Sequence, residues 1–98
     1  MYQTIGADEF SRLKKIKVID VRETQEHAYG YIKEAHLMPL NTIPSQLHNL
    51  SKEDTYYVVC HSGARSSIAC QYLSNQGYGV VNVMGGMSAY KGDLEYEM

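Results

Sequence analysis

One almost unbroken run of β-branched and aromatic residues, at positions 55–60, constrains the fold more than any other part of the chain. Its sequence is Thr-Tyr-Tyr-Val-Val-Cys. A run of this kind is typical of a parallel strand that is covered on both faces of its sheet. We therefore predict a central strand of a parallel sheet at residues 55–60.

Two further runs of β-branched residues lie on either side of this segment. They cover residues 17–21 (Lys-Val-Ile-Asp-Val) and residues 80–84 (Val-Val-Asn-Val-Met). Segments with helical spacing separate the three runs, and strands that alternate with helices usually form a mainly parallel sheet. The sequence therefore predicts an α/β fold.

Short helices are predicted in four places, the first of them directly after Gly6. There Gly6 can act as the N-cap and Glu9 as the carboxylate of a capping box. Residues 66–76 form the longest helical segment, and the other two helices are expected just after Asn41-Thr42 and at residues 87–94. The side chains expected to face the core are Phe10, Leu13, Ile43, Leu47, Leu50, Ile68, Ala69, Tyr72 and Leu73.

Composition places the chain among small, ordinary globular proteins. It has 98 residues and a formal net charge of -2, which fits one domain over residues 1–98 whose last residues, 95–98, fray. We expect no broad basic surface for nucleic acid and no membrane span. Two cysteines are too few for a disulfide framework, so we expect a cytoplasmic protein with reduced thiols. The four histidines and two cysteines show no standard ligand spacing, and no metal site is predicted.

The feature that carries chemical information is a cysteine at the C-terminal end of the predicted central strand. Cys60 is followed by a loop and then by a helix whose N-terminus points back toward it. In parallel α/β sheets this edge binds ligands, and backbone N–H groups with the positive end of a helix dipole form an anion cradle. Arg65 would add a full positive charge. We expect these groups to lower the pKa of Cys60 from about 8.5, so that the nucleophilic thiolate is present.

The segment around Cys60 resembles the active-site loop of the rhodanese family. Its sequence is Cys-His-Ser-Gly-Ala-Arg-Ser at residues 60–66, and two other segments agree with it. Residues 20–35 are similar to the family's upstream signature, an Asp-Val-Arg strand end that leads into a Gly-His-Ile-x-Gly-Ala segment. Residues 85–90 resemble its closing glycine pair and aromatic residue. The motifs follow the family's order and spacing over nearly the whole chain.

Three residues depart from the family pattern. Tyr31 stands where the family usually has histidine, Glu34 where it usually has glycine, and Tyr90 where it usually has tryptophan. None of the three lies in the Cys60 loop. We therefore expect them to affect the upstream turn and the packing of the last helix, and to leave the nucleophile in place.

The resemblance implies both a fold and an activity. The fold would be a three-layer sandwich with a central, mainly parallel five-stranded sheet and helices on both faces. The Cys60 thiolate would attack the outer sulfur of a donor such as thiosulfate or a persulfide, hold that sulfur as a persulfide, and pass it on. Cyanide is the laboratory acceptor, thiols or a protein sulfur-relay partner would accept it in the cell, and no cofactor is implied. The implied anion-binding loop consists of His61, Ser62, Gly63, Ala64, Arg65 and Ser66.

Two other functions on the same fold stay open. Relatives that act on phosphate or arsenate carry one more residue between cysteine and arginine, and the four residues between Cys60 and Arg65 favour the smaller cradle of a sulfurtransferase. Non-catalytic rhodanese-like binding modules often lack the cysteine, so its presence favours an enzyme. A cysteine can persist without turnover, which keeps a binding or regulatory module as the main alternative.

Several side chains have a structural explanation beside a functional one. Arg22 could reach the site from a neighbouring strand end, but an ion pair with Glu26, one helical turn away, is favoured. Asp20 is expected to anchor backbone or arginine groups and not to transfer protons. Cys70 falls outside the apolar stripe of its helix, which predicts partial exposure. A general-base role for His61 is not favoured, because side chains adjacent in sequence usually diverge.

Overall fold

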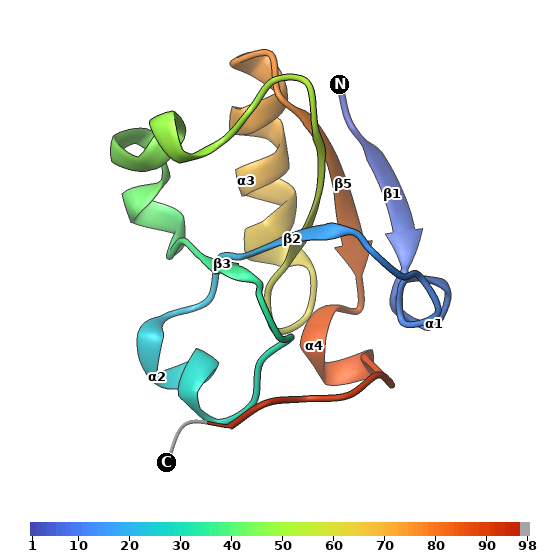
Figure 1. The fold of residues 1–98 in the computed structure, drawn as a ribbon. Coiled ribbons are helices and arrows are strands. Elements are labelled where there is room, and N and C mark those ends of the chain that lie inside the picture. Colours follow the sequence, from blue (N-terminus) through green and yellow to red (C-terminus); the bar gives the residue numbers. More distant parts are fainter. Residues whose placement is uncertain (97–98) are drawn as a thin grey trace.

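The computed structural model describes residues 1–96 as a parallel sheet with helices on both of its faces (Figure 1). The five strands are all parallel and lie in the order β1-β5-β4-β2-β3. This arrangement confirms the predicted α/β fold. In chain order the elements are β1 (Gln3–Gly6), α1 (Ala7–Phe10), β2 (Lys17–Asp20), α2 (Thr24–Ala28), β3 (His36–Leu37), the 3-10 helix η1 (Leu40–Asn49), β4 (Thr55–Val59), α3 (Ala64–Asn75), β5 (Gly79–Met84) and α4 (Gly86–Ala89).

The strand β4 lies in the middle of the sheet, as predicted. It pairs with β2 on one side and with β5 on the other, so that Val58 aligns with Ile19 and with Asn82. Its side chains alternate between two buried clusters, with Val58 in one and Val59 in the other. Helices and loops cover the strand on both sides, so its side chains are apolar on both faces.

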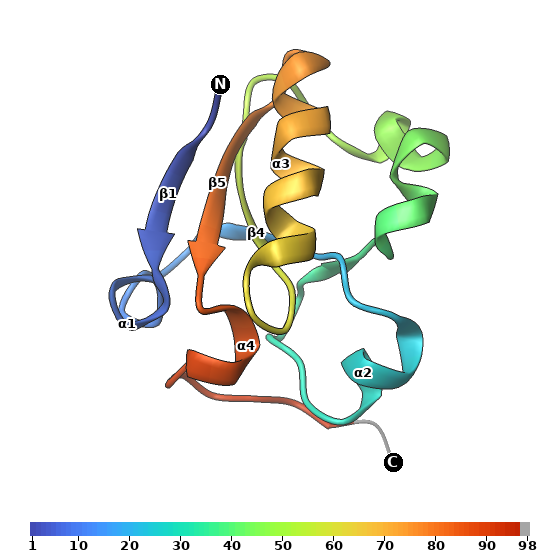
Figure 2. The same ribbon diagram turned by 180° about the vertical axis from the view of Figure 1, so that it is seen from behind.

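Helices cover the two faces of the sheet and give the molecule three layers (Figure 2). On one face, α3 and η1 contribute Leu73, Ala69 and Ile43 to a buried cluster. On the other face, α1 contributes the buried Phe10 and α4 the partly buried Met87. The three-layer sandwich with a five-stranded sheet is confirmed.

The helices differ from the predicted ones in their bounds and type. Gly6 is the N-cap of α1, but within the described residues no side-chain hydrogen bond from Glu9 completes a capping box. The second helix, η1, is a 3-10 helix that contains Pro44, a residue without the N–H donor that the interior of an α-helix needs. The helix α3 begins at Ala64, earlier than predicted, and α4 already ends at Ala89.

The buried stripe of α3 agrees only in part with the predicted one, since Ala69 and Leu73 are buried as expected. Ile68, expected to face the core, is 61% exposed, whereas Cys70, expected to be partly exposed, is 0% exposed. The prediction was wrong because it placed the large apolar Ile68 inside and left the small Ser66 outside. The buried residues have regular helical spacing and are Ser66, Ala69, Cys70 and Leu73.

The sequence pattern did not predict the two edge strands, β1 and β3, or the pairing of the C-terminal segment. The strand β1 has the sequence Gln-Thr-Ile-Gly with only Ile5 partly buried, and β3 has two residues, so neither forms an apolar run. Glu95, expected to fray, instead pairs with Tyr31 through backbone hydrogen bonds of 2.7 and 2.9 Å. The last part of the predicted frayed tail, residues 97–98, lies outside the described residues.

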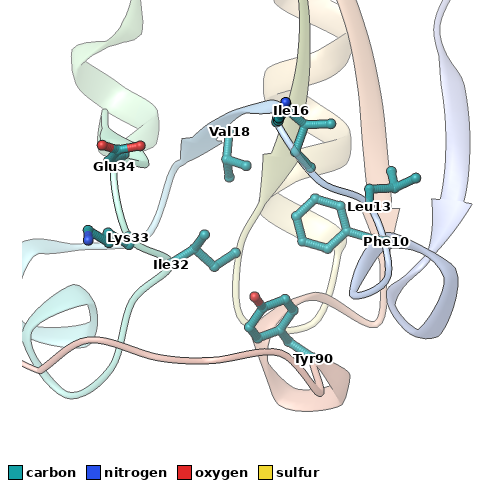
Figure 3. Close-up of a pocket in the computed structure, with 9 residues that line it drawn as sticks. Phe10, Leu13, Ile16, Val18, Ile32, Lys33, Glu34 and Tyr90 are labelled. Carbon is teal, nitrogen blue, oxygen red and sulfur yellow. The ribbon is translucent and has the colours of Figure 1, made fainter.

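The three departures from the rhodanese pattern each have a structural counterpart. Tyr31 stacks on His27, with ring centroids 4.2 Å apart. Tyr90 lies 5.8 Å from the ring of Phe10, and both line a cavity of about 210 Å³ (Figure 3). Glu34 lies at the rim of the same cavity and has a φ of 67°, in the left-handed region that glycine adopts without steric cost.

We predict that Glu34→Gly stabilises the protein, because glycine relieves the left-handed strain at this position. The free energy of unfolding should rise by about 1 kcal/mol, which corresponds to a melting temperature about 4–8 °C higher. Denaturant and thermal unfolding would measure the change. The neighbouring Lys33→Gly is the control, since Lys33 is exposed and has no positive φ, and it should be destabilising. Equal losses for both variants would show that no strain resides at Glu34.

Candidate active site

The candidate site is the loop between β4 and α3, at the edge where the parallel strands end. Cys60 directly follows β4, and Ala64 begins α3. Both views show this loop at the lower end of α3, between α2 and α4 (Figures 1 and 2). The side chain of Cys60 is 1% exposed, whereas His61, Ser62 and Ala64 are exposed. The sulfur therefore lies beneath a loop whose outer residues face solvent.

The segment at the start of α4 fixes the backbone of this loop. Gly86 has a φ of 55°, and a side chain there would overlap the carbonyl oxygen of Cys60, so only glycine permits the close approach. Backbone N–H groups of this segment hold three successive loop carbonyls. The N–H of Met87 donates to the carbonyl of Cys60 at 2.8 Å. The N–H groups of Ser88 and Gly85 donate to the carbonyls of His61 and Ser62, at 2.9 and 3.2 Å respectively.

The sulfur of Cys60 is surrounded by hydrogen-bonding groups. The Gly63 N–H donates to Sγ at 3.0 Å, and the Cys60 thiol donates to the hydroxyl oxygen of Ser66 at 3.4 Å. Gly63 has a φ of 114°, a conformation that brings its N–H to the sulfur and favours glycine. The Ser66 hydroxyl also donates to Asn82 Oδ1 at 2.5 Å, so β5 fixes the position of this hydroxyl.

These contacts lower the pKa of Cys60 below that of an ordinary thiol. Burial acts in the opposite direction and is the largest single influence. The Ser66 hydroxyl and the backbone N–H groups of Ser66, Gly63 and Ser62 outweigh it, because they stabilise the thiolate. At the start of α3 the Cys60 sulfur is thus surrounded by neutral hydrogen-bond donors.

Arg65 forms its side-chain hydrogen bonds with a carboxylate, and its charge also interacts with the Cys60 thiolate. Its Nη1 and Nη2 donate to the two carboxylate oxygens of Glu26 at 2.6 and 2.8 Å. This bidentate ion pair lowers the pKa of Glu26 to about 2 and raises the pKa of Arg65. The carboxylate of Glu26, on α2, therefore neutralises the positive charge of Arg65. The predicted pairing of Arg22 with Glu26 is wrong.

Arg22 belongs to a buried cluster behind the site. Its Nε and Nη2 donate to Asp20 at 3.0 and 2.8 Å, and Nη2 also donates to the Gly30 carbonyl at 2.8 Å. His27 Nδ1 lies 3.0 Å from the same aspartate. Asp20 is 1% exposed and anchors both an arginine and backbone, as predicted. Through these contacts Arg22 joins the end of β2 to the backbone of Gly30.

The structure adds three residues that the sequence did not suggest as part of the site. Glu26 pairs with the loop arginine, Asn82 fixes the Ser66 hydroxyl, and Gly86 allows α4 to reach the loop carbonyls. Glu26 and Gly86 lie inside the upstream and closing motifs, but their partners depend on tertiary contacts. The cavity beside Tyr90 is separate, since no residue of the Cys60 loop lines it (Figure 3).

Comparison with known proteins identifies the family to which this loop belongs. The sequence matches the Rhodanese-like domain family over residues 7–93. The chain is a member of this family. It is 41% identical to the putative sulfurtransferase YtwF of Bacillus subtilis, over 95% of this chain and 85% of the relative. The rhodanese-like domain protein of Staphylococcus aureus has a similar structure, with a TM-score of 0.90, 39% identity and coverage of 98% of this chain and 99% of that chain.

A further relative combines a rhodanese-like sequence with additional chain. The putative sulfur carrier protein YrkF of Bacillus subtilis is 32% identical over 95% of this chain, which corresponds to 48% of the relative. Within residues 1–96 of this rhodanese-like domain, no group of three His, Cys, Asp or Glu side chains is arranged to hold a metal ion. Over the same residues, no helix combines the length and apolar character needed to cross a membrane.

We predict that Ser66→Ala raises the pKa of Cys60, because the thiolate loses the stabilising contact with the Ser66 hydroxyl. The thiolate fraction at neutral pH should therefore fall. The measurement is the pH dependence of thiolate absorbance in a Cys70→Ser background. Ser62→Ala is the matched control, since the Ser62 side chain is exposed and this residue acts through its backbone N–H. A shift of equal size in the control would contradict the role of the Ser66 hydroxyl.

Proposed function

We propose that this protein is a sulfurtransferase, acting as a single domain over residues 1–98, that carries sulfur as a persulfide on Cys60. The observation that supports this most directly is the Cys60 sulfur, which lies among the N–H groups of its loop and the Ser66 hydroxyl and has a lowered pKa. The thiolate is the nucleophilic form of cysteine. Homology to sulfurtransferases gives independent support.

The reaction would proceed by two displacements at sulfur. The Cys60 thiolate attacks the outer sulfur of thiosulfate or of a persulfide, a new S–S bond forms, and the old one breaks. Sulfite or a thiolate leaves with the electron pair. An acceptor, which is cyanide in the laboratory or a thiol in the cell, then attacks the outer sulfur of the Cys60 persulfide and regenerates the thiolate. No external oxidant or reductant is needed.

The same loop would stabilise both charged forms of the enzyme. The N–H groups of Ser62, Gly63 and Ser66 favour negative charge at the Cys60 sulfur, and they would likewise favour the negative charge of a persulfide or of a departing anion. Because α4 holds the loop carbonyls away from this point, the donors are oriented before the substrate arrives.

The partner of the reaction would be a small sulfur donor or a protein in a sulfur relay. The relative named as a sulfur carrier supports the second type. Both cysteines of the chain are free thiols, which fits a reducing compartment such as the cytoplasm. The short interval between Cys60 and Arg65 favours sulfur transfer over phosphate or arsenate chemistry on the same fold.

We predict that thiosulfate or a small-molecule persulfide adds one sulfur atom to the protein, and that Cys60→Ser abolishes this addition. Cys70→Ser is the matched control and should load normally, because Cys70 is buried and its pKa is raised to about 12, which keeps its thiol protonated. Intact-mass spectrometry measures the adduct. Absence of an adduct with every donor would contradict the proposal; phosphatase turnover would then favour that alternative, and no turnover would favour a binding module.

A further inference from the structure

The ion pair between Glu26 and Arg65 affects which anions the Cys60 loop can attract. Glu26 lies on α2, and Arg65 lies in the first turn of α3, directly after the loop. Nη1 and Nη2 of Arg65 donate to the two carboxylate oxygens of Glu26 at 2.6 and 2.8 Å. This bidentate geometry makes such ion pairs strong and specific. About a third of each side chain is exposed, 34% for Arg65 and 36% for Glu26.

The charges near the loop do not favour a doubly charged anion. The Cys60 thiolate and Glu23, at the start of α2, also act on Arg65. Two carboxylates therefore compete with the sulfur for one guanidinium on this side of the site. Arg22 adds no free positive charge, because Asp20 binds it in the buried cluster. Negative charge at the sulfur is therefore stabilised by neutral N–H and O–H donors, which act at short range.

We propose that Glu26 is a specificity-determining residue, which disfavours dianionic sulfur donors such as thiosulfate and so favours thiol persulfides. This inference rests on the proposed sulfurtransferase function. A thiol persulfide carries at most one negative charge on the sulfurs that react, whereas thiosulfate carries two. At this site the carboxylate of Glu26 is already paired with Arg65. The transfer from a persulfide is balanced: Cys60 attacks the outer sulfur, the S–S bond breaks, and the donor thiolate leaves with the electron pair.

A second contact of Glu26 makes a conservative test possible. Its Oε1 also accepts a hydrogen bond from the backbone N–H of Glu23 at 2.9 Å, which closes a capping box at the start of α2. Glu26→Gln keeps an oxygen for this cap and removes the charge that neutralises Arg65. The variant therefore separates the charge of Glu26 from its role in the helix start.

The experiment compares second-order rates of Cys60 persulfide formation from thiosulfate and from the persulfide of 2-mercaptoethanol, whose only charged group is the persulfide, followed by intact mass. For Glu26→Gln we expect a rate with thiosulfate about tenfold higher, with a change below about threefold for the persulfide. The matched control is Glu53→Gln, which removes one negative charge from an exposed residue before β4, at the opposite end of that strand from Cys60. It should change neither rate appreciably. The double variant Glu26→Gln/Arg65→Gln should lose the gain with thiosulfate, because the gain requires a released guanidinium.

The wild type supplies a test that needs no variant. If charge repulsion limits thiosulfate, added salt should raise its rate with the wild type, because ions screen exposed charges. A salt-independent or falling rate would overturn the inference, as would equal changes with both donors in Glu26→Gln, which would show that Glu26 only positions Arg65. Failure of the wild type to load sulfur from either donor would instead overturn the proposed function.

Discussion

The site depends on hydrogen bonds that hold the carbonyl groups of the Cys60 loop in one direction. Three N–H groups at the start of α4 bind successive loop carbonyls, and the loop N–H groups are consequently free to face the sulfur. Backbone donors arranged in this way stabilise an anion without a metal or a charged side chain. Gly86 makes the contact possible, since any side chain there would overlap the carbonyl of Cys60. The closing glycine pair is thus part of the site's construction.

Both arginines near the site are committed to carboxylates. Arg22 is buried against Asp20 and the Gly30 carbonyl, where it holds the turn after β2. Arg65 is held by Glu26 at the surface. The protein therefore controls the Cys60 sulfur through oriented dipoles at close range. Its charged groups determine how α2 lies against the loop and which anions approach.

Sequence patterns predicted the elements that appear as continuous apolar runs along the chain. The run at residues 55–60 could only be a covered strand, and the glycine-containing loop after it had to bring backbone N–H groups toward Cys60. The errors arose where tertiary contacts decide. Ser66 is buried and Ile68 exposed, because the hydroxyl of Ser66 has a partner on β5 that no local pattern reveals. Likewise, Arg22 is the arginine close to Glu26 along the chain, but the fold pairs Glu26 with Arg65, 39 residues away.

The near-complete enclosure of the Cys60 thiol has a consequence for its chemical lifetime. Oxidants modify thiolates that are both acidic and accessible, and this sulfur is acidic but only 1% exposed. Peroxide in solution would therefore meet the loop before it met the thiolate. Under the proposed function, a sulfur atom bound to Cys60 would extend this side chain by one bond. The enclosure that slows oxidation of the thiolate would then cover the transferred atom less completely than the cysteine sulfur itself.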